Sequence, residues 1–231
     1  MGTQTNAGKN QGPHIIWTVR HGQRIDNIDV TWKNSAPRGA WDDSPLSSRG
    51  LQQAKECGEF FAKQEVGVLI SSPFTRCVQT ASAISESFPH SLPICIEPGI
   101  CESLHVCQDP PGYQPLIDLK KQFPNIDTTY EAIITHMKPE KNEIECKGRL
   151  TAVLNELKKR YSENILIVSH GAPIAMIHEI LDGKWLYVGQ CTISKFISTD
   201  GKNYAAAICG DSSHLSDRTN LREREIQKPI L

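Results

Sequence analysis

Two histidine-containing tripeptides, far apart in the chain, each follow a short apolar run. Arg20-His21-Gly22 follows the apolar residues 15–19, and Ser169-His170-Gly171 follows the apolar residues 165–168. Each pattern predicts a buried strand that delivers a histidine at its end, where a glycine lets the chain turn. Because ligands bind at the carboxyl ends of parallel strands, we expect both imidazoles to lie in one crevice.

Strand-like apolar runs alternate with amphipathic helical patterns along the chain. The predicted strands cover residues 15–19, 66–71, 93–96, 165–168, 192–198 and 204–209. The predicted helices cover residues 47–64, 75–88, 146–161 and 172–181. This order predicts an α/β fold with a mostly parallel central sheet and helices on both faces. The last two strands are predicted to form a hairpin.

The length of 231 residues suits one α/β domain with an insertion. We expect a flexible polar N-terminus over residues 1–13, a single domain over residues 14–212 and a flexible charged tail over residues 213–231. Residues 99–144 are weakly patterned and contain several prolines, so they are predicted to form an insertion over the crevice. Residues 29–45 are predicted to form a long ordered loop.

The composition argues against several classes of partner. The formal net charge is −1, so no global basic field favours nucleic acid or an anionic membrane. No apolar run is long enough to suggest a membrane span or a signal peptide. The eight cysteines include no C-x-x-C pair and accompany no export signal, so reduced thiols in a cytoplasmic protein are expected. The histidines and cysteines show no metal-ligand spacing, and neither a metal nor a cofactor is expected.

Four motifs, in this order, resemble those of the histidine phosphatase (phosphoglycerate mutase-like) superfamily. They are Arg20-His21-Gly22, residues 45–50 with Gln53-Ala54, residues 71–76 with Gln79-Thr80-Ala81, and Ser169-His170-Gly171. Within that superfamily, residues 76–81, 97–102 and 127–130 are similar to the phosphatase domain of the suppressor-of-T-cell-receptor-signalling proteins. That group includes protein tyrosine phosphatases and an insect steroid-phosphate phosphatase. It also carries a second arginine where Arg24 stands.

The resemblance implies a metal-independent phosphomonoesterase that works through a phosphohistidine intermediate. A phosphate monoester carries about −2 charge near neutrality, so its site needs several fixed cations. Arg20, Arg24 and Arg76 are each predicted at or just past a strand end, and guanidinium groups suit a bidentate grip on phosphate oxygens. The arginines also favour a neutral His21 as the attacking imidazole. His170 would donate hydrogen bonds to the developing charge.

The leaving-group oxygen needs a proton, and two glutamates follow the third predicted strand. Glu102 matches the family position that donates a proton and later activates water. Glu97 competes for this role because it lies nearer the end of the strand. The family match favours Glu102 as the general acid.

The residues after the first histidine depart from the pattern of the mutases. Phosphoglycerate mutases and sugar-bisphosphate phosphatases carry a motif that resembles R-H-G-E-[ST]. In this chain Gln23 and Arg24 occupy the last two positions of that motif. This departure argues against mutase activity. The resemblance to the phosphatase group implies phosphotyrosine or another aryl or alkyl phosphate as substrate, on a phosphorylated small molecule or a phosphoprotein. Two alternatives remain open: a catalytically weak module that binds phosphorylated ligands, and a small-metabolite phosphatase or mutase. The group that the chain resembles tends to dimerise, so a homodimer is a further expectation.

Overall fold

A six-stranded sheet forms the centre of the computed structural model, which describes residues 13–223. The strands are β1 (His14–Arg20), β2 (Val68–Ser71), β3 (Ile94–Ile96), β4 (Ile165–Ser169), β5 (Ile193–Ser198) and β6 (Ala205–Asp211). Their order across the sheet is β3-β2-β4-β1-β5-β6. Strands β1 to β4 pair in parallel, whereas β5 runs antiparallel to β1 and to β6. The predicted mostly parallel sheet and its terminal hairpin are therefore confirmed.

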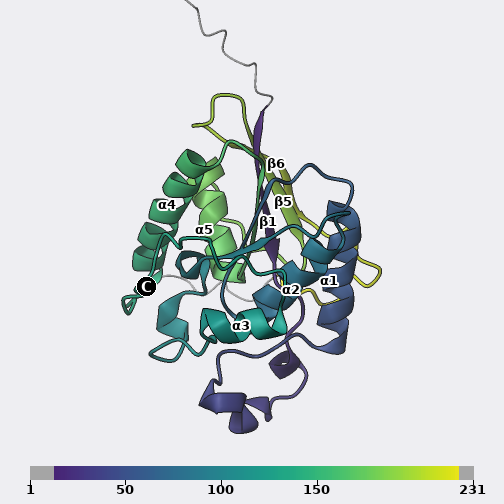
Figure 1. Ribbon diagram of the computed structural model, residues 1–231, viewed down its shortest axis with the longest axis vertical. Coiled ribbons are helices and arrows are strands. Elements are labelled where there is room, and N and C mark those ends of the chain that lie inside the picture. The colour runs from purple at the N-terminus through teal and green to yellow at the C-terminus, as the bar shows by residue number, and fades with distance from the viewer. Residues whose placement is uncertain (1–12, 224–231) are drawn as a thin grey trace, which may run out of the picture.

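Helices cover both faces of this sheet. They are α1 (Ser48–Phe61), α2 (Thr75–Glu86), α3 (Leu116–Gln122), α4 (Glu143–Arg160) and α5 (Gly171–Asp182). Short 3-10 helices cover Ile25–Asn27, Trp32–Ser35, Pro37–Gly39, Pro98–Ile100 and Leu104–Val106. Figure 1 shows α1 and α2 on one side of the sheet and α4 and α5 on the other. The α/β fold with helices on both faces is thus the one that the sequence predicts.

The strands divide their apolar side chains between the two faces, because successive side chains of a strand point to opposite sides. Trp17 of β1 belongs to the apolar cluster that α1 and α2 cover, whereas Ile16 belongs to the cluster that α4 and α5 cover. Leu166 and Ile167 of β4 divide in the same way. Burial on both faces explains why these strands read as continuous apolar runs in the sequence.

Capping residues set where several helices begin and end. The Ser47 side chain accepts a hydrogen bond from the Gly50 backbone N–H at the start of α1. Asn142 caps α4 in the same way, so this helix begins before the predicted start at residue 146. Gly183 ends α5 in the left-handed conformation, with a φ of 75°. Residues 99–144 contain α3, which their weak pattern does not predict.

The described part of the C-terminal segment packs on the domain, unlike the flexible tail that the sequence predicts from residue 213. Leu215 and Leu221 are buried in the apolar cluster that α1 and α2 cover. The backbone N–H of Ser216 donates to Glu56 Oε2 at 3.2 Å, and its hydroxyl donates to the same carboxylate. Two isolated leucines among charged residues form no periodic apolar face, so the sequence pattern misses this packing. Residues 1–12 and 224–231, also predicted to be flexible, lie outside the described chain.

The eight cysteines all lie within the described residues and are free thiols, as predicted. Burial raises the pKa of Cys101 and of Cys146 to about 12, so these thiols stay neutral and act as small apolar groups. None of the helices between residues 13 and 223 combines the length and the apolar character that a bilayer crossing requires.

Candidate active site

The two predicted histidines lie side by side at the carboxyl edge of the sheet. Strands β1 and β4 are adjacent and parallel, and Arg20 pairs with Ser169. The next residue continues this register, because the His21 backbone N–H donates to the Ser169 carbonyl oxygen at 3.0 Å. The rings of His21 and His170 therefore meet edge to face, with their centroids 5.3 Å apart. Both side chains are buried.

The His21 ring is held in one orientation and one tautomer. Its Nδ1 lies 2.8 Å from the Gly22 carbonyl oxygen, which can only accept, so Nδ1 carries the hydrogen. The other ring nitrogen, Nε2, then keeps its lone pair. Burial, followed by the positive charges of Arg76 and Arg20, holds the pKa of His21 well below its usual 6.5. The ring is thus a neutral imidazole whose Nε2 can act as a nucleophile.

The His170 ring is neutral for the same reasons and has different partners. Its Nδ1 accepts a hydrogen bond from Arg76 Nη2 at 3.1 Å, because a guanidinium group can only donate. The neutral ring therefore carries its hydrogen on Nε2, which lies 2.8 Å from Ser72 Oγ and donates to it. Burial and the Arg76 charge hold the pKa of His170 well below 6.5. Ser72 lies in the third motif, but the sequence assigns it no role.

Arg20 and Arg76 bring buried positive charge to the two rings. Arg20 Nη1 donates to the Val188 carbonyl oxygen at 2.8 Å, and its guanidinium lies 4.9 Å from the centre of the Tyr187 ring. Arg76 Nη1 donates to the Asp42 carbonyl oxygen at 2.7 Å. The Nε–H groups of both arginines are buried without a hydrogen-bond partner among residues 13–223. Because a buried donor without a partner costs free energy, these groups are available to an anion that binds beside them.

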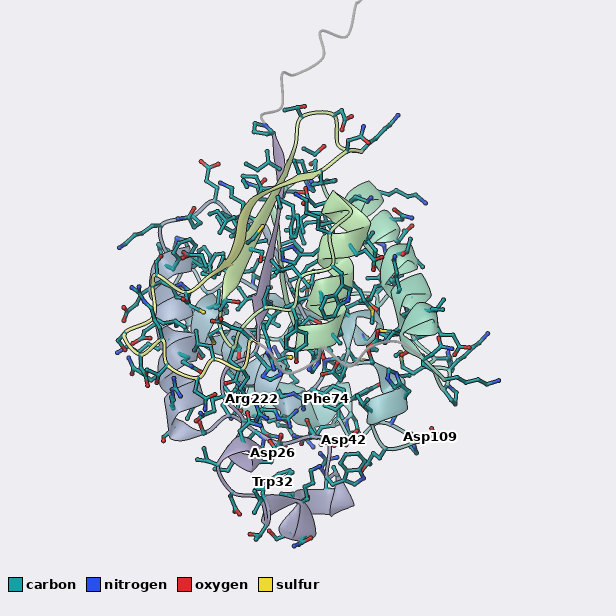
Figure 2. The ribbon with its side chains drawn as sticks, turned by 180° about the vertical axis from the view of Figure 1, so that it is seen from behind. Asp26, Trp32, Asp42, Phe74, Asp109 and Arg222 are labelled. Carbon is teal, nitrogen blue, oxygen red and sulfur yellow. The ribbon has the colours of Figure 1, made fainter. Side chains whose placement is uncertain are left out.

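Arg24, the third predicted phosphate ligand, is engaged by a neighbour. Its Nε donates to Asp26 Oδ1 at 2.8 Å and its Nη2 to Asp26 Oδ2 at 2.7 Å. Figure 2 labels Asp26 near Arg222. Burial lowers the pKa of Arg222, and the charge of Asp26 acts in the opposite direction. The Arg24 charge still lowers the pKa of His21 and of His170, so the side chain lies close to the site.

The two candidate glutamates have different surroundings. Glu102 Oε2 lies 3.7 Å from His170 Nδ1, and the side chain is 17% exposed. Its Oε1 accepts a hydrogen bond from the Ser103 backbone N–H at 3.0 Å. Glu97 is fully buried, and its two oxygens accept four hydrogen bonds, from the backbone N–H groups of Gly99, Ile133 and Ile134 and from the Tyr130 hydroxyl. Only Glu102 therefore lies beside the histidines with an oxygen that is open to a ligand.

An aspartate pair that the sequence does not single out fixes the mouth of the site. The Asp42 backbone carbonyl oxygen accepts a hydrogen bond from Arg76. The Asp42 side-chain carboxylate accepts one from the Gly112 backbone N–H at 3.2 Å. Asp43 accepts from the backbone N–H and the hydroxyl of Thr75, the first residue of α2. The loop over residues 29–45 thus joins α2 to the insertion, and Figure 2 shows Asp42 close to Phe74 at this edge.

The first two motifs meet backbone to backbone. A Cβ atom on Gly22 would lie 2.6 Å from the Gly50 carbonyl oxygen, and one on Gly50 would lie 2.1 Å from the Gln23 carbonyl oxygen. Gln23, which departs from the mutase pattern, is used structurally, because its Oε1 accepts from the Ser47 hydroxyl at 2.8 Å. This close approach places the start of α1 directly behind the loop that carries His21.

The fold and the site define an α/β protein of the phosphoglycerate mutase-like class, with two strand-end histidines in an arginine-lined centre. Within residues 13–223, no cluster of three or more histidine, cysteine, aspartate or glutamate side chains is arranged to hold a metal ion. The chain belongs to the histidine phosphatase superfamily (branch 1), whose family model matches residues 16–204.

Known proteins place the chain more narrowly. It is 32% identical over 197 residues to human ubiquitin-associated and SH3 domain-containing protein A, a match that covers 69% of this chain and 30% of that protein. It is 24% identical over 202 residues to the ecdysteroid-phosphate phosphatase of Drosophila melanogaster, covering 73% of this chain and 27% of that protein. These relatives fit the group that the motifs indicate, and the chain spans less than a third of either.

A solved structure shows the same fold. The ecdysone phosphate phosphatase of Bombyx mori, determined in complex with tungstate, superimposes with a TM-score of 0.68 at 19% identity. The superposition covers 90% of this chain and 98% of that chain. Membership in the superfamily, together with relatives that are named as phosphatases, supports a phosphatase function.

Proposed function

We propose that the chain is a metal-independent phosphomonoesterase that transfers the phosphoryl group first to His21 and then to water. The observation that carries this proposal is the fixed, neutral His21 ring beside two buried arginines whose Nε–H groups have no partner in the described chain. Phosphoryl transfer requires a nucleophile with a free lone pair and hydrogen-bond donors that are available to the phosphate oxygens. Positioning and charge stabilisation supply most of its catalysis.

In the first step, Arg20 and Arg76 hold the phosphate oxygens while His21 Nε2 attacks the phosphorus atom. The new P–N bond forms as the P–O bond to the leaving group breaks. The Glu102 carboxyl gives its proton to the departing oxygen, which leaves as an alcohol or a phenol. In this step the His170 Nε2–H exchanges its Ser72 partner for a phosphoryl oxygen on which charge develops.

In the second step, the Glu102 carboxylate takes a proton from water, and the resulting hydroxide attacks the phosphohistidine. The P–N bond breaks, His21 recovers its lone pair, and inorganic phosphate is released. The same carboxyl group thus acts as acid and then as base, and its protonation state is restored after each turnover.

The substrate that we propose is phosphotyrosine or another aryl or alkyl phosphate, on a small molecule or on a phosphoprotein. The name of the Drosophila relative describes a phosphatase of ecdysteroid phosphates, which supports an organic phosphate monoester as substrate. We further propose a cytoplasmic homodimer that does not act on nucleic acid or membranes.

Hydrolysis of 4-nitrophenyl phosphate in excess chelator tests the proposal, with His21→Ala compared with the wild type. We expect chelator-resistant turnover that falls by roughly 10⁴-fold or more in the variant, because the nucleophile is lost. His90→Ala, which removes an exposed imidazole outside the site, is the matched control. Wild-type turnover in a folded His21→Ala protein would contradict the proposal.

A catalytically weak module that binds phosphorylated ligands is the second candidate. The Arg24–Asp26 ion pair favours it, because the pair leaves two arginines rather than three for the phosphate. Tight binding of inorganic phosphate or tungstate, without turnover of any phosphate monoester, would support this candidate. Rapid hydrolysis by the wild type would exclude it.

A further inference from the structure

A buried ion pair outside the candidate active site grips the loop that carries Glu102. Arg149 of α4 donates from Nε to Glu140 Oε1 at 2.6 Å and from Nη2 to Glu140 Oε2 at 3.1 Å. The two side chains are only 9% and 5% exposed. Removing two charges from water is unfavourable, and a buried ion pair is weak evidence for stability. The position of the pair beside the Glu102 loop therefore indicates a role other than stability.

Besides a contact from Nη2 to Cys146 Sγ at 3.2 Å, this arginine donates to the backbone of the loop up to and including Glu102. Arg149 Nη1 donates to the Gly99 carbonyl oxygen at 2.9 Å and to the Cys101 carbonyl oxygen at 3.3 Å. Its Nη2 donates to the carbonyl oxygen of Glu102 itself at 3.2 Å. One guanidinium group thus fixes three carbonyl groups over four consecutive positions.

The glutamate of the pair holds the same loop on the far side of Glu102. Glu140 Oε2 accepts from the Leu104 backbone N–H at 2.8 Å. The Arg149–Glu140 pair therefore makes hydrogen bonds to the loop from Gly99 to Leu104 before, at and after Glu102. Among residues 13–223, the Glu102 carboxyl group has one backbone partner, Ser103, and it lies 3.7 Å from His170.

We propose that Arg149, held by Glu140, is a positioning residue that sets the reach of the Glu102 carboxyl group toward the leaving-group oxygen. This inference rests on the proposed function. It makes a prediction that a purely structural ion pair does not make. Proton donation matters most when the leaving group is a poor one, since an alkoxide leaves only with a proton whereas 4-nitrophenolate leaves without one.

The test compares Arg149→Lys and Glu140→Gln with the wild type on 4-nitrophenyl phosphate and on glycerol 2-phosphate. We expect kcat/KM on the alkyl ester to fall by roughly 10- to 100-fold, as for a catalytic group that is displaced by about 1 Å. The kcat/KM value is the readout because it reports the steps up to phosphorylation of His21, before Glu102 acts as a base. The kcat/KM on the aryl ester and the inhibition constant of inorganic phosphate are expected to stay unchanged. Glu102→Gln should show the same dependence on the leaving group, and adding Arg149→Lys to it should have little further effect.

Arg160→Lys is the matched control on the same helix. Arg160 also binds a glutamate, Glu156 at 3.1 Å, and a backbone carbonyl, that of Glu131 at 2.7 Å, but it does not touch the Glu102 loop. Thermal melts establish that each variant is folded. Equal losses of kcat/KM on the two esters in Arg149→Lys would overturn the inference. Failure of both Arg149→Lys and Glu140→Gln to fold would also overturn it.

The outcomes also separate this inference from the proposed function. If Glu102→Gln discriminates between the two esters but the Arg149 and Glu140 variants do not, only the positioning role is wrong. If His21→Ala retains turnover, the histidine mechanism itself is wrong.

Discussion

The Tyr130 hydroxyl donates a hydrogen bond to the Glu97 carboxylate at 2.8 Å, and this contact ties the insertion to the end of β3. The same carboxylate accepts from the backbone N–H groups of Ile133 and Ile134, which also belong to the insertion. Glu97 is therefore an anchor for residues that cover the site. The two glutamates that the sequence leaves in competition are thus distinguished by their partners.

Glu97→Gln is expected to destabilise the protein without changing its chemistry. An amide has one oxygen, and its NH₂ group would face backbone N–H donors that then lose their acceptor. The free energy of unfolding should fall by about 1–3 kcal/mol, measured by urea denaturation, while kcat of the folded protein stays unchanged. Glu102→Gln should lower kcat and leave the free energy of unfolding unchanged. A Glu97→Gln protein of normal stability and low kcat would contradict this assignment.

Two helical glycines should respond to alanine with opposite signs. A Cβ on Gly50 of α1 would lie 2.1 Å from the Gln23 carbonyl oxygen, whereas one on Gly148 of α4 would meet nothing within 4 Å. Gly50→Ala must therefore push the His21 loop away and should cost about 1–3 kcal/mol with a loss of activity. Gly148→Ala should stabilise the protein by roughly 0.5–1 kcal/mol. Thermal melts check both, and a neutral Gly50→Ala would contradict the close approach.

Leu221→Ala should show that the C-terminal segment supports the site. The leucine is buried, and the next residue, Arg222, receives Arg20 Nη1 on its carbonyl oxygen at 3.2 Å. We expect a loss of about 2–5 kcal/mol in unfolding free energy and weaker inhibition by inorganic phosphate. Leu186→Ala is the control, because Leu186 is 38% exposed. Unchanged stability in Leu221→Ala would mean that the segment is not held as the structure places it.

Sequence patterns predict those features of this protein that follow from periodicity. Continuous apolar runs locate β1 and β4, and their parallel pairing then brings His21 and His170 together. The partners of these residues are set by tertiary contacts that no periodicity encodes. Ser72 reaches His170 from another strand end, and Asp42 reaches Arg76 from an irregular loop. The Arg24–Asp26 pair is local in sequence, yet the choice between a neighbouring carboxylate and a ligand depends on the folded loop.

Stability should fall as the pH drops below about 6.5. His21 and His170 have folded-state pKa values well below 6.5, chiefly because they are buried, whereas an unfolded chain titrates near 6.5. Below that pH the unfolded state binds more protons than the folded state, so the free energy of unfolding decreases by up to about 1.4 kcal/mol per pH unit for each histidine. Urea denaturation at pH 8, 7, 6 and 5 measures the slope. A His21→Asn variant should have a shallower slope than the wild type, because one of the buried imidazoles is gone while His170 and His178 remain. Equal slopes would show that His21 is not held neutral by burial.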